Sequence, residues 1–212
     1  MENTFFKRCY YSSWCALIWL FGKIWLRVKY VNWRSVPRTG SLILIANHQS
    51  FLDPPLLGVG LKRYSWYMAR KTLFRGLFGW HLRQLNAYPV SQEGNAVAGI
   101  KTTFKLLKND QCVLIFPEGS RSLDGTLQPF QGGILMIAKR AKVPIIPCSI
   151  WGAHQAMPRG SSLIWPCKVT VRYGEVIPPE AIEGMTEQEL MELLYQKIAA
   201  LLPPEALPKT VE

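Results

Sequence analysis

The sequence predicts an α/β fold in a single domain, with a mostly parallel central sheet covered by helices and an N-terminal amphipathic helix. Short apolar segments alternate along the chain with longer amphipathic ones. Several of the short segments are apolar at every position, as expected for strands that are buried on both faces. The chain has 212 residues, 49% of them hydrophobic, which suits one sizeable core. Together these observations indicate helices packed on both faces of one sheet.

The first expected element is a helix over residues 11–30. Its apolar side chains recur at the spacing of one helix face, as Trp14, Leu17 and Phe21 illustrate. No stretch of eighteen apolar residues lacks a charge, so a bilayer-spanning segment is not expected. A basic helix with Trp and Leu on its apolar face suits the interface between lipid headgroups and acyl chains, which predicts a membrane-surface helix. A helix packed in the core of a soluble protein is the alternative interpretation.

Strands and helices are expected to alternate after this helix. The expected strands cover residues 41–46, 64–69, 87–90, 111–116, 143–150 and 168–173. The expected helices cover residues 54–61, 72–85, 94–108, 133–141 and 186–202. The last helix starts with Thr186 and Glu189, which have the spacing of a capping box. We therefore expect a membrane-associating segment over residues 1–36, the main domain over residues 37–202, and a loose proline-containing tail over residues 203–212.

The net charge of +11 arises from 25 Lys and Arg against 14 Asp and Glu, and it is concentrated in the first two thirds of the chain. Such a field suits nucleic acid, an anionic membrane surface, or a phosphorylated or acidic partner. No recognised nucleic-acid-binding module matches the sequence, so nucleic acid is not the expected partner. The five cysteines are scattered without CxxC spacing, which predicts neither a zinc site nor a disulfide framework.

The first candidate site lies just after the expected strand 41–46. His48 follows this strand at the end where open α/β sheets bind their ligands. Asp53 precedes Pro54 and is expected to be the N-cap of the next helix. A tight loop could bring the Asp53 carboxylate against one imidazole nitrogen and leave the other free to accept a proton. The pair would then be a general base; an ordinary N-cap beside a structural histidine is an equally open alternative.

The second candidate site is the loop Phe116-Pro117-Glu118-Gly119-Ser120-Arg121-Ser122, which also follows an apolar strand. Its glycine, its hydroxyls and the guanidinium of Arg121 offer donors for a phosphate. Glu118 could hold Arg121 in place or accept from substrate hydroxyls. Such a loop by itself is more often a turn than a site. Two polar loops at one edge of a sheet nevertheless favour a functional site, and no GxSxG, P-loop or HExxH motif competes with them.

At these positions the sequence resembles the glycerophospholipid acyltransferase family, in particular its small bacterial 1-acylglycerol-3-phosphate acyltransferase type. Asn47-His48 with Asp53 resembles the NHxxxxD motif, and residues 116–122 are similar to the FPEGTRS motif. Val143-Pro144-Ile145-Ile146-Pro147 resembles the apolar VPIxP motif, which is thought to border the acyl-donor site. The resemblance covers residues 37–174.

The resemblance implies transfer of a fatty acyl group from acyl-CoA or acyl carrier protein to the free hydroxyl of lysophosphatidate, giving phosphatidate for phospholipid biosynthesis. It implies that His48 is the general base and that Asp53 orients it. The implied substrate-binding residues are Asn47, Glu118, Gly119, Ser120 and Arg121, and those on the acyl-donor side are Pro144, Ile145 and Pro147. Neither a metal nor a cofactor is expected, because a thioester is already activated. The implied location is the cytoplasmic face of the inner or cell membrane, as a monotopic membrane-associated protein.

Two departures from the family pattern keep the acceptor open. The stretch Val90-Ser91-Gln92 stands where many members have V-D-R, and Phe130-Gln131-Gly132-Gly133 stands where many have F-K-x-G. Each change removes a cation that could bind phosphate. Acylation of another lysophospholipid, or of another membrane-lipid acceptor, therefore remains an alternative, and a noncatalytic basic domain that binds lipid or nucleic acid is a further one.

Overall fold

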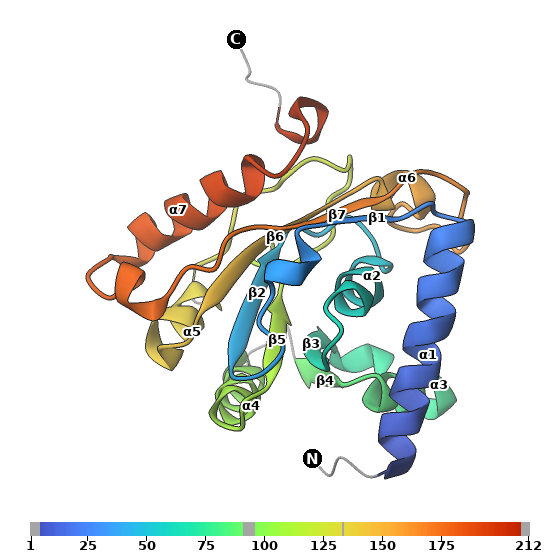
Figure 1. Ribbon diagram of the computed structural model, residues 1–212, viewed down its shortest axis with the longest axis horizontal. Coiled ribbons are helices and arrows are strands. Elements are labelled where there is room, and N and C mark those ends of the chain that lie inside the picture. The colour runs from blue at the N-terminus through green and yellow to red at the C-terminus, as the bar shows by residue number, and fades with distance from the viewer. Residues whose placement is uncertain (1–4, 91–95, 133, 209–212) are drawn as a thin grey trace.

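The computed structural model describes residues 5–90, 96–132 and 134–208 (Figure 1). Its central sheet has seven strands in the order β1-β7-β6-β2-β5-β3-β4. The strands are β1 (Lys29–Val31), β2 (Leu42–Ala46), β3 (Ser65–Arg70), β4 (Ala87–Val90), β5 (Cys112–Ile115), β6 (Ile145–Trp151) and β7 (Thr170–Tyr173). All neighbours in the sheet are parallel except β6 and β7. The predicted mostly parallel α/β fold in a single domain is confirmed.

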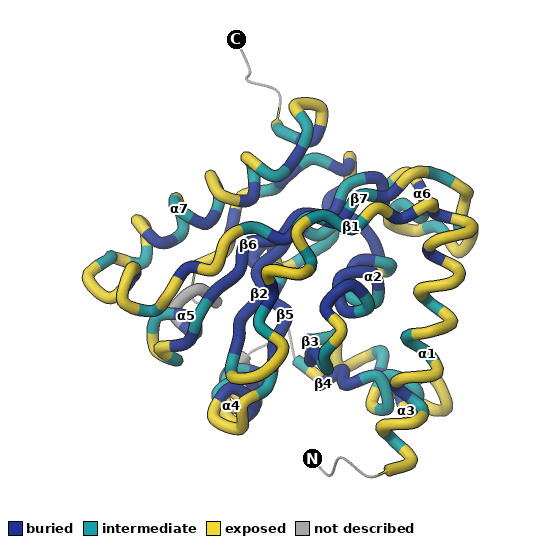
Figure 2. Tube along the Cα trace, in the orientation of Figure 1, coloured by how far each residue is buried: buried dark blue, intermediate teal, exposed yellow. Residues whose placement is uncertain are grey.

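Helices cover both faces of the sheet. They are α1 (Phe5–Ile24), α2 (Asp53–Gly60), α3 (Gly76–Gln84), α4 (Ala96–Lys108), α5 (Ile134–Ala141), α6 (Ala153–Ala156) and α7 (Glu187–Ala199). One face is covered by α4, α5 and α7, and the other by α2 and α6, with α1 packed on the outer side of α2 (Figures 1 and 2). Among the helices that the structure describes, none has both the length and the hydropathy needed to cross a bilayer.

Strand β2 illustrates why the sheet is buried on both sides. Ile43 and Ile45 pack into the cluster under α4, α5 and α7, whereas Leu42, Leu44 and Ala46 pack toward α2. All five side chains are fully buried, as their uniformly apolar sequence predicts. Helix α7 buries the stripe Leu190, Leu194 and Ile198 against the first of these clusters, and the predicted capping box at its start is present.

The first helix ends earlier than predicted, because the chain enters the sheet after it. The helix spans Phe5–Ile24, and Arg27 then adopts a positive φ of 43°. Leu26 and Val28 are buried, and residues 29–31 form β1, a strand that the sequence analysis missed. Residues 26–36 therefore belong to the main domain, so the predicted boundary at residue 36 is wrong.

Two further predictions are corrected by local packing. The helix expected over residues 72–85 begins only at Gly76, after a 3₁₀ turn over residues 71–73, because Gly76 has a φ of +53°. The expected loose tail is packed over residues 203–208, since Ala206 is fully buried and its carbonyl accepts from the Leu127 amide at 2.8 Å. The predicted helix starts at residues 94 and 133 lie outside the described residues.

Candidate active site

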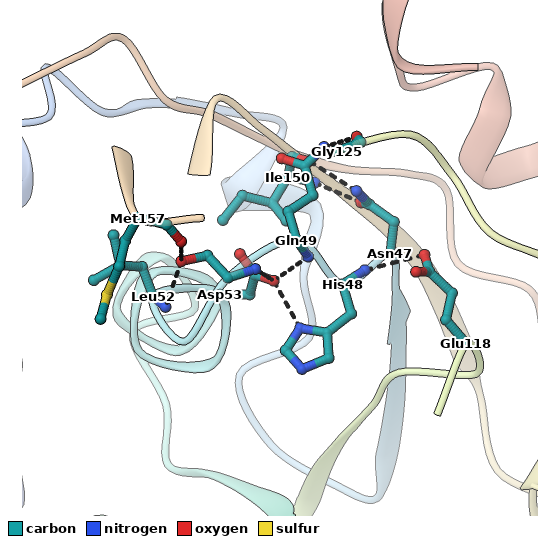
Figure 3. A network of polar contacts seen from close by, with 10 residues as sticks. Asn47, His48, Gln49, Leu52, Asp53, Glu118, Gly125, Ile150 and Met157 are labelled. Carbon is teal, nitrogen blue, oxygen red and sulfur yellow. Dashed lines mark hydrogen bonds and ion pairs between the residues drawn. The ribbon is translucent and has the colours of Figure 1, made fainter. Parts of the chain in front are cut away.

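The two predicted loops meet at one edge of the sheet because they follow neighbouring parallel strands, β2 and β5. Two hydrogen bonds join the loops at His48. The Ser122 amide donates to the His48 carbonyl at 2.8 Å. The His48 amide donates to Oε1 of Glu118 at 3.1 Å (Figure 3). The parallel sheet thus brings together loops that are about seventy residues apart in sequence.

Asp53 is the polar centre of the first loop. Its Oδ2 accepts from His48 Nδ1 at 2.7 Å and from the backbone amides of Gln49 and Ser50 at 2.5 and 2.7 Å (Figure 3). The predicted N-cap role is wrong, since Leu52 occupies the cap position and Asp53 is the first residue of α2. The carboxylate turns back toward the loop because three donors converge on it there, and the positive end of α2 favours its charge.

This arrangement prepares His48 to accept a proton at Nε2. The carboxylate on Nδ1 holds the tautomer in which Nδ1 carries the proton and stabilises the imidazolium. The ring stacks on Phe116, with centroids 4.1 Å apart. The His48 side chain is 18% exposed, and none of the described residues hydrogen-bonds to Nε2. Nε2 is therefore open to a further hydrogen-bonding group.

Asn47 is buried, and both halves of its amide are used by the backbone of Ile150. Its Nδ2 donates to the Ile150 carbonyl at 2.9 Å, and its Oδ1 accepts from the Ile150 amide at 2.8 Å (Figure 3). Because Asn47 is also only 1% exposed, its amide does not face a substrate, and the predicted substrate-binding role is not supported. Asn47 instead ties the end of β2 to β6 and so fixes the backbone that carries His48.

Glu118 is 4% exposed, and burial raises the pKa of its carboxyl to about 9. Backbone hydrogen bonds from His48 and Gln128 lower this pKa, whereas the charges of Asp53 and Asp124 raise it further. The carboxyl is therefore protonated at neutral pH. It faces the His48 backbone rather than solvent, so Glu118 supports the loop, and the predicted contact with substrate hydroxyls is not supported.

Arg121 carries its charge at the surface of the site. Its guanidinium lies 3.6 Å from the ring centroid of Phe51, which gives a cation–π contact. Its Nη1 is buried and has no hydrogen-bond partner among the described residues. Arg121 is not paired with Glu118, contrary to one of the two predicted roles of that residue. Its donors remain available to an anion.

Two further arginines lie near Arg121, and the sequence analysis did not select either. Burial lowers the pKa of Arg121, and the charges of Arg159 and Arg70 lower it further. Arg70 is the last residue of β3, at the same edge of the sheet. A basic residue at the end of a predicted strand is a sequence signal that could have selected it. Arg159 follows α6 in a loop held by the Ser50 hydroxyl, which donates to the Met157 carbonyl at 2.8 Å. Three guanidinium groups thus give this edge a strong positive potential.

Gly119 and Ser120 form the turn between Glu118 and Arg121. Gly119 has a φ of +70°, a left-handed conformation that favours glycine over residues with a Cβ. Its amide donates within the turn to the Phe116 carbonyl at 3.1 Å, so it is not free for a ligand. Ser120 is half-buried beside it.

The predicted acyl-donor residues lie away from His48. Ile145 pairs with Ile43 near the amino end of β2, whereas His48 follows its carboxyl end. Ile145 is fully buried and exchanges two backbone hydrogen bonds with Ile177, at 2.9 and 2.8 Å. Pro147 is buried and Pro144 half-buried. These residues pack the core of the sheet, and their predicted position on the acyl-donor side stays a prediction.

Two stretches depart from the family pattern, and the structure describes the key residue of one of them, Gln131. Gln131 donates from Nε2 to the Glu118 carbonyl at 3.2 Å, so its neutral amide braces the loop. Ser91, Gln92 and Gly133 lie outside the described residues. At the position of Gln131, the structure therefore has a loop contact in place of a cation.

Comparison with known proteins agrees with this geometry. The sequence model of the acyltransferase family matches residues 27–151, more than half of the chain. The chain belongs to the acyltransferase family. A 1-acyl-sn-glycerol-3-phosphate acyltransferase of Bacillus subtilis (strain 168) is 31% identical to this acyltransferase over 180 residues, which cover 82% of the chain and 87% of that protein.

Two further proteins extend the comparison. A 1-acyl-sn-glycerol-3-phosphate acyltransferase of Streptococcus pneumoniae is 31% identical over 163 residues, 75% of the chain and 59% of that protein. The crystal structure of the 1-acyl-sn-glycerophosphate acyltransferase of Thermotoga maritima superposes with a TM-score of 0.72 at 30% identity, covering 88% of this chain and 79% of that one. The predicted family and the predicted enzyme class, an O-acyltransferase, are confirmed.

The neutral state of Glu118 in this acyltransferase gives a testable prediction. Glu118→Gln should keep kcat within about threefold of the parent, because an amide oxygen can still accept the His48 N–H. Glu118→Ala removes that acceptor and should lower kcat at least tenfold, the scale of about 1.4 kcal/mol. Steady-state rates at saturating substrate test both variants. Equal losses in the two variants would show that the negative charge is needed.

The pH dependence of the unfolding free energy should also reflect the neutral state of the Glu118 carboxyl. The carboxyl pKa is about 9 in the folded protein and about 4.5 when unfolded, so the folded state binds more protons between these pH values. The parent therefore loses stability as pH rises from about 4.5 to about 9, and Glu118→Gln lacks this loss. Denaturant titrations should show the variant gaining stability over the parent across this window. A constant difference would contradict the assignment.

Proposed function

We propose that this acyltransferase moves a fatty acyl group from an acyl thioester, either acyl-CoA or acyl carrier protein, to the free hydroxyl of 1-acylglycerol-3-phosphate, giving phosphatidate. The observation that carries the proposal is the 2.7 Å contact between His48 Nδ1 and Asp53 Oδ2, beside the unpaired guanidinium of Arg121. A base and an anion site at one sheet edge match an acceptor that has a hydroxyl and a phosphate. The names of the relatives from Bacillus subtilis and Streptococcus pneumoniae support this acceptor.

The proposed reaction starts at Nε2 of His48. This nitrogen takes the proton of the acceptor hydroxyl while the hydroxyl oxygen attacks the thioester carbonyl. The tetrahedral intermediate then expels the thiolate, which takes the proton back from His48. Asp53 keeps the imidazolium stable between the two transfers. A positioned base of this kind contributes about 10² to 10⁴ in rate, and the thioester needs neither a metal nor a further cofactor for activation.

Arg121 is the proposed phosphate ligand, with Arg70 and Arg159 strengthening the field around it. A guanidinium offers a planar fork that suits two phosphate oxygens. Contact with the Phe51 ring restricts the orientation of this fork before the substrate arrives. Because the acceptor and product are anionic lipids, the same field favours their entry.

The proposal includes a membrane-associated, monotopic location at the cytoplasmic face. The acceptor has a long acyl chain and resides in the bilayer, so the enzyme must work at its surface. Helix α1 exposes apolar side chains, including Ile24 at 69%, and it is the proposed contact with that surface.

A second candidate is acylation of another lysophospholipid or membrane-lipid acceptor. The neutral Gln131, whose amide binds the Glu118 carbonyl, favours it because one expected cation is missing. An acceptor panel with one labelled acyl donor, analysed by product mass, distinguishes the two candidates. We expect lysophosphatidate to give the highest kcat/KM. A tenfold preference for an acceptor without a terminal phosphate would favour the second candidate.

The role of His48 is tested by His48→Ala. We expect kcat to fall by about 10² to 10⁴ while the fold is retained, because the Gln49 and Ser50 amides still donate to Asp53 Oδ2. Lys101→Ala, an exposed charge on α4, is the control and should keep the parent kcat. Retention of acyl transfer by His48→Ala would overturn the assignment. Lipid binding without any turnover by the parent would overturn it as well.

The role of Arg121 is tested by separating the two substrates. Arg121→Ala should raise the acceptor KM at least tenfold and change the donor KM by less than threefold, because only the acceptor's phosphate loses its ligand. Lys105→Ala, an exposed charge on α4, is the control and should change neither. Equal increases in the two KM values would contradict phosphate binding by Arg121.

A further inference from the structure

Most of the exposed large apolar side chains of the described residues lie in three segments. The first is α1, the second is α3, where Leu77 is 81% exposed, and the third is the loop after α6, where Leu163 is 62% exposed. The others in these segments are Phe5, Phe6, Leu17, Trp19, Leu20, Phe21 and Ile24 on α1, Trp25 just after it, Phe78 and Trp80 on α3, and Trp165 in the loop, whereas Phe51, Leu123 and Val176 lie elsewhere. Exposure on this scale in one region marks an interaction surface.

The three segments are joined through α1. Near its amino end, Tyr10 hydrogen-bonds to Nδ1 of His81 at 2.7 Å and contacts the ring of Trp80 edge-on at 5.3 Å. At its carboxyl end, Nε1 of Trp25 donates to the Ile164 carbonyl at 3.0 Å. In Figures 1 and 2, α3 lies beside the lower half of α1 and the loop after α6 lies beside its upper end. We call α1, α3 and residues 163–165 together the apolar face.

The charges around the apolar face select an anionic partner. Asp53 is the only acidic residue between residues 5 and 90, and it is fully buried, whereas the same stretch has thirteen Lys and Arg. The loop over residues 157–168 contains Arg159 and Lys168 and no acid. Trp and Leu on a surface with basic residues and no exposed acid match the headgroup region of an anionic bilayer.

The apolar face also adjoins the active site in sequence. Arg70, at the end of β3, precedes α3 by only a 3₁₀ turn and two residues. Arg159 precedes Leu163 by four residues, and its loop is fastened to the His48 loop by the Ser50–Met157 hydrogen bond. Each of the two arginines near Arg121 therefore leads into one of the two segments that flank α1.

We propose that α3 and residues 163–165 insert into the headgroup region of an anionic bilayer together with α1, so that the membrane contact is made by three segments. The two added segments bring the arginine-bearing edge of the sheet to the lipid surface. This inference rests on the proposed function in one respect, which is that the acceptor is a lipid. Membrane binding itself is measured without turnover, so the two proposals fail independently.

The test is cosedimentation of the full chain with vesicles of phosphatidylglycerol and phosphatidylcholine. Two double variants alter the added segments, Leu77→Ser with Phe78→Ser and Leu163→Ser with Trp165→Ser. All four side chains are exposed, so folding should be retained, which unfolding curves check. Each double variant should bind at least tenfold more weakly than the parent. Val176→Ser, an exposed apolar position outside the apolar face, is the control and should bind as the parent does.

Three results would overturn the inference. Parent-like binding by both double variants would confine the contact to α1. Equal binding of the parent to vesicles of phosphatidylcholine alone would remove the role of the basic residues. A dimer of the parent that both double variants dissociate, without loss of vesicle binding, would show that a second copy covers the apolar face. If the double variants bind vesicles more weakly but the parent does not acylate lysophosphatidate, the proposed function is rejected and this inference stands.

Discussion

The Oδ2 atom of Asp53 organises the active-site loop. It is buried and accepts hydrogen bonds from the His48 ring and from the amides of Gln49 and Ser50. A buried carboxylate is costly unless it is paired, so these three hydrogen bonds favour the observed loop conformation. The tautomer and the direction of the His48 ring follow from that conformation.

Around this carboxylate, the parallel sheet supplies the rest of the site. The ends of β2 and β5 meet, so the loop that carries Arg121 is hydrogen-bonded to the backbone of His48 through Glu118 and Ser122. The neutral Glu118 permits this contact without placing a second negative charge beside Asp53. The site thus combines one buried anion with a positive rim, a distribution that suits a base and an anionic acceptor.

The chain links the apolar face directly to the active site. Arg70 leads into α3, and Arg159 leads into residues 163–165. Helix α1 packs on α2, the helix that begins with Asp53, so the proposed membrane contact and the His48 loop are both supported by α2. This coupling gives a physical reason for the N-terminal helix to be integral to the domain rather than an appended anchor.

The sequence by itself determined what depends on neighbouring residues: the apolar strands, the amphipathic helices, and the His48 and Arg121 loops at strand ends. Tertiary structure decided what depends on distant pairing. The strand β1 exists because it pairs with β7, and Asn47 is structural because Ile150, 103 residues away, takes both halves of its amide. Likewise Arg159 joins the site only because its loop is fastened to Ser50. Local sequence periodicity does not predict such contacts, since each is created by the packing of segments that are remote in the chain.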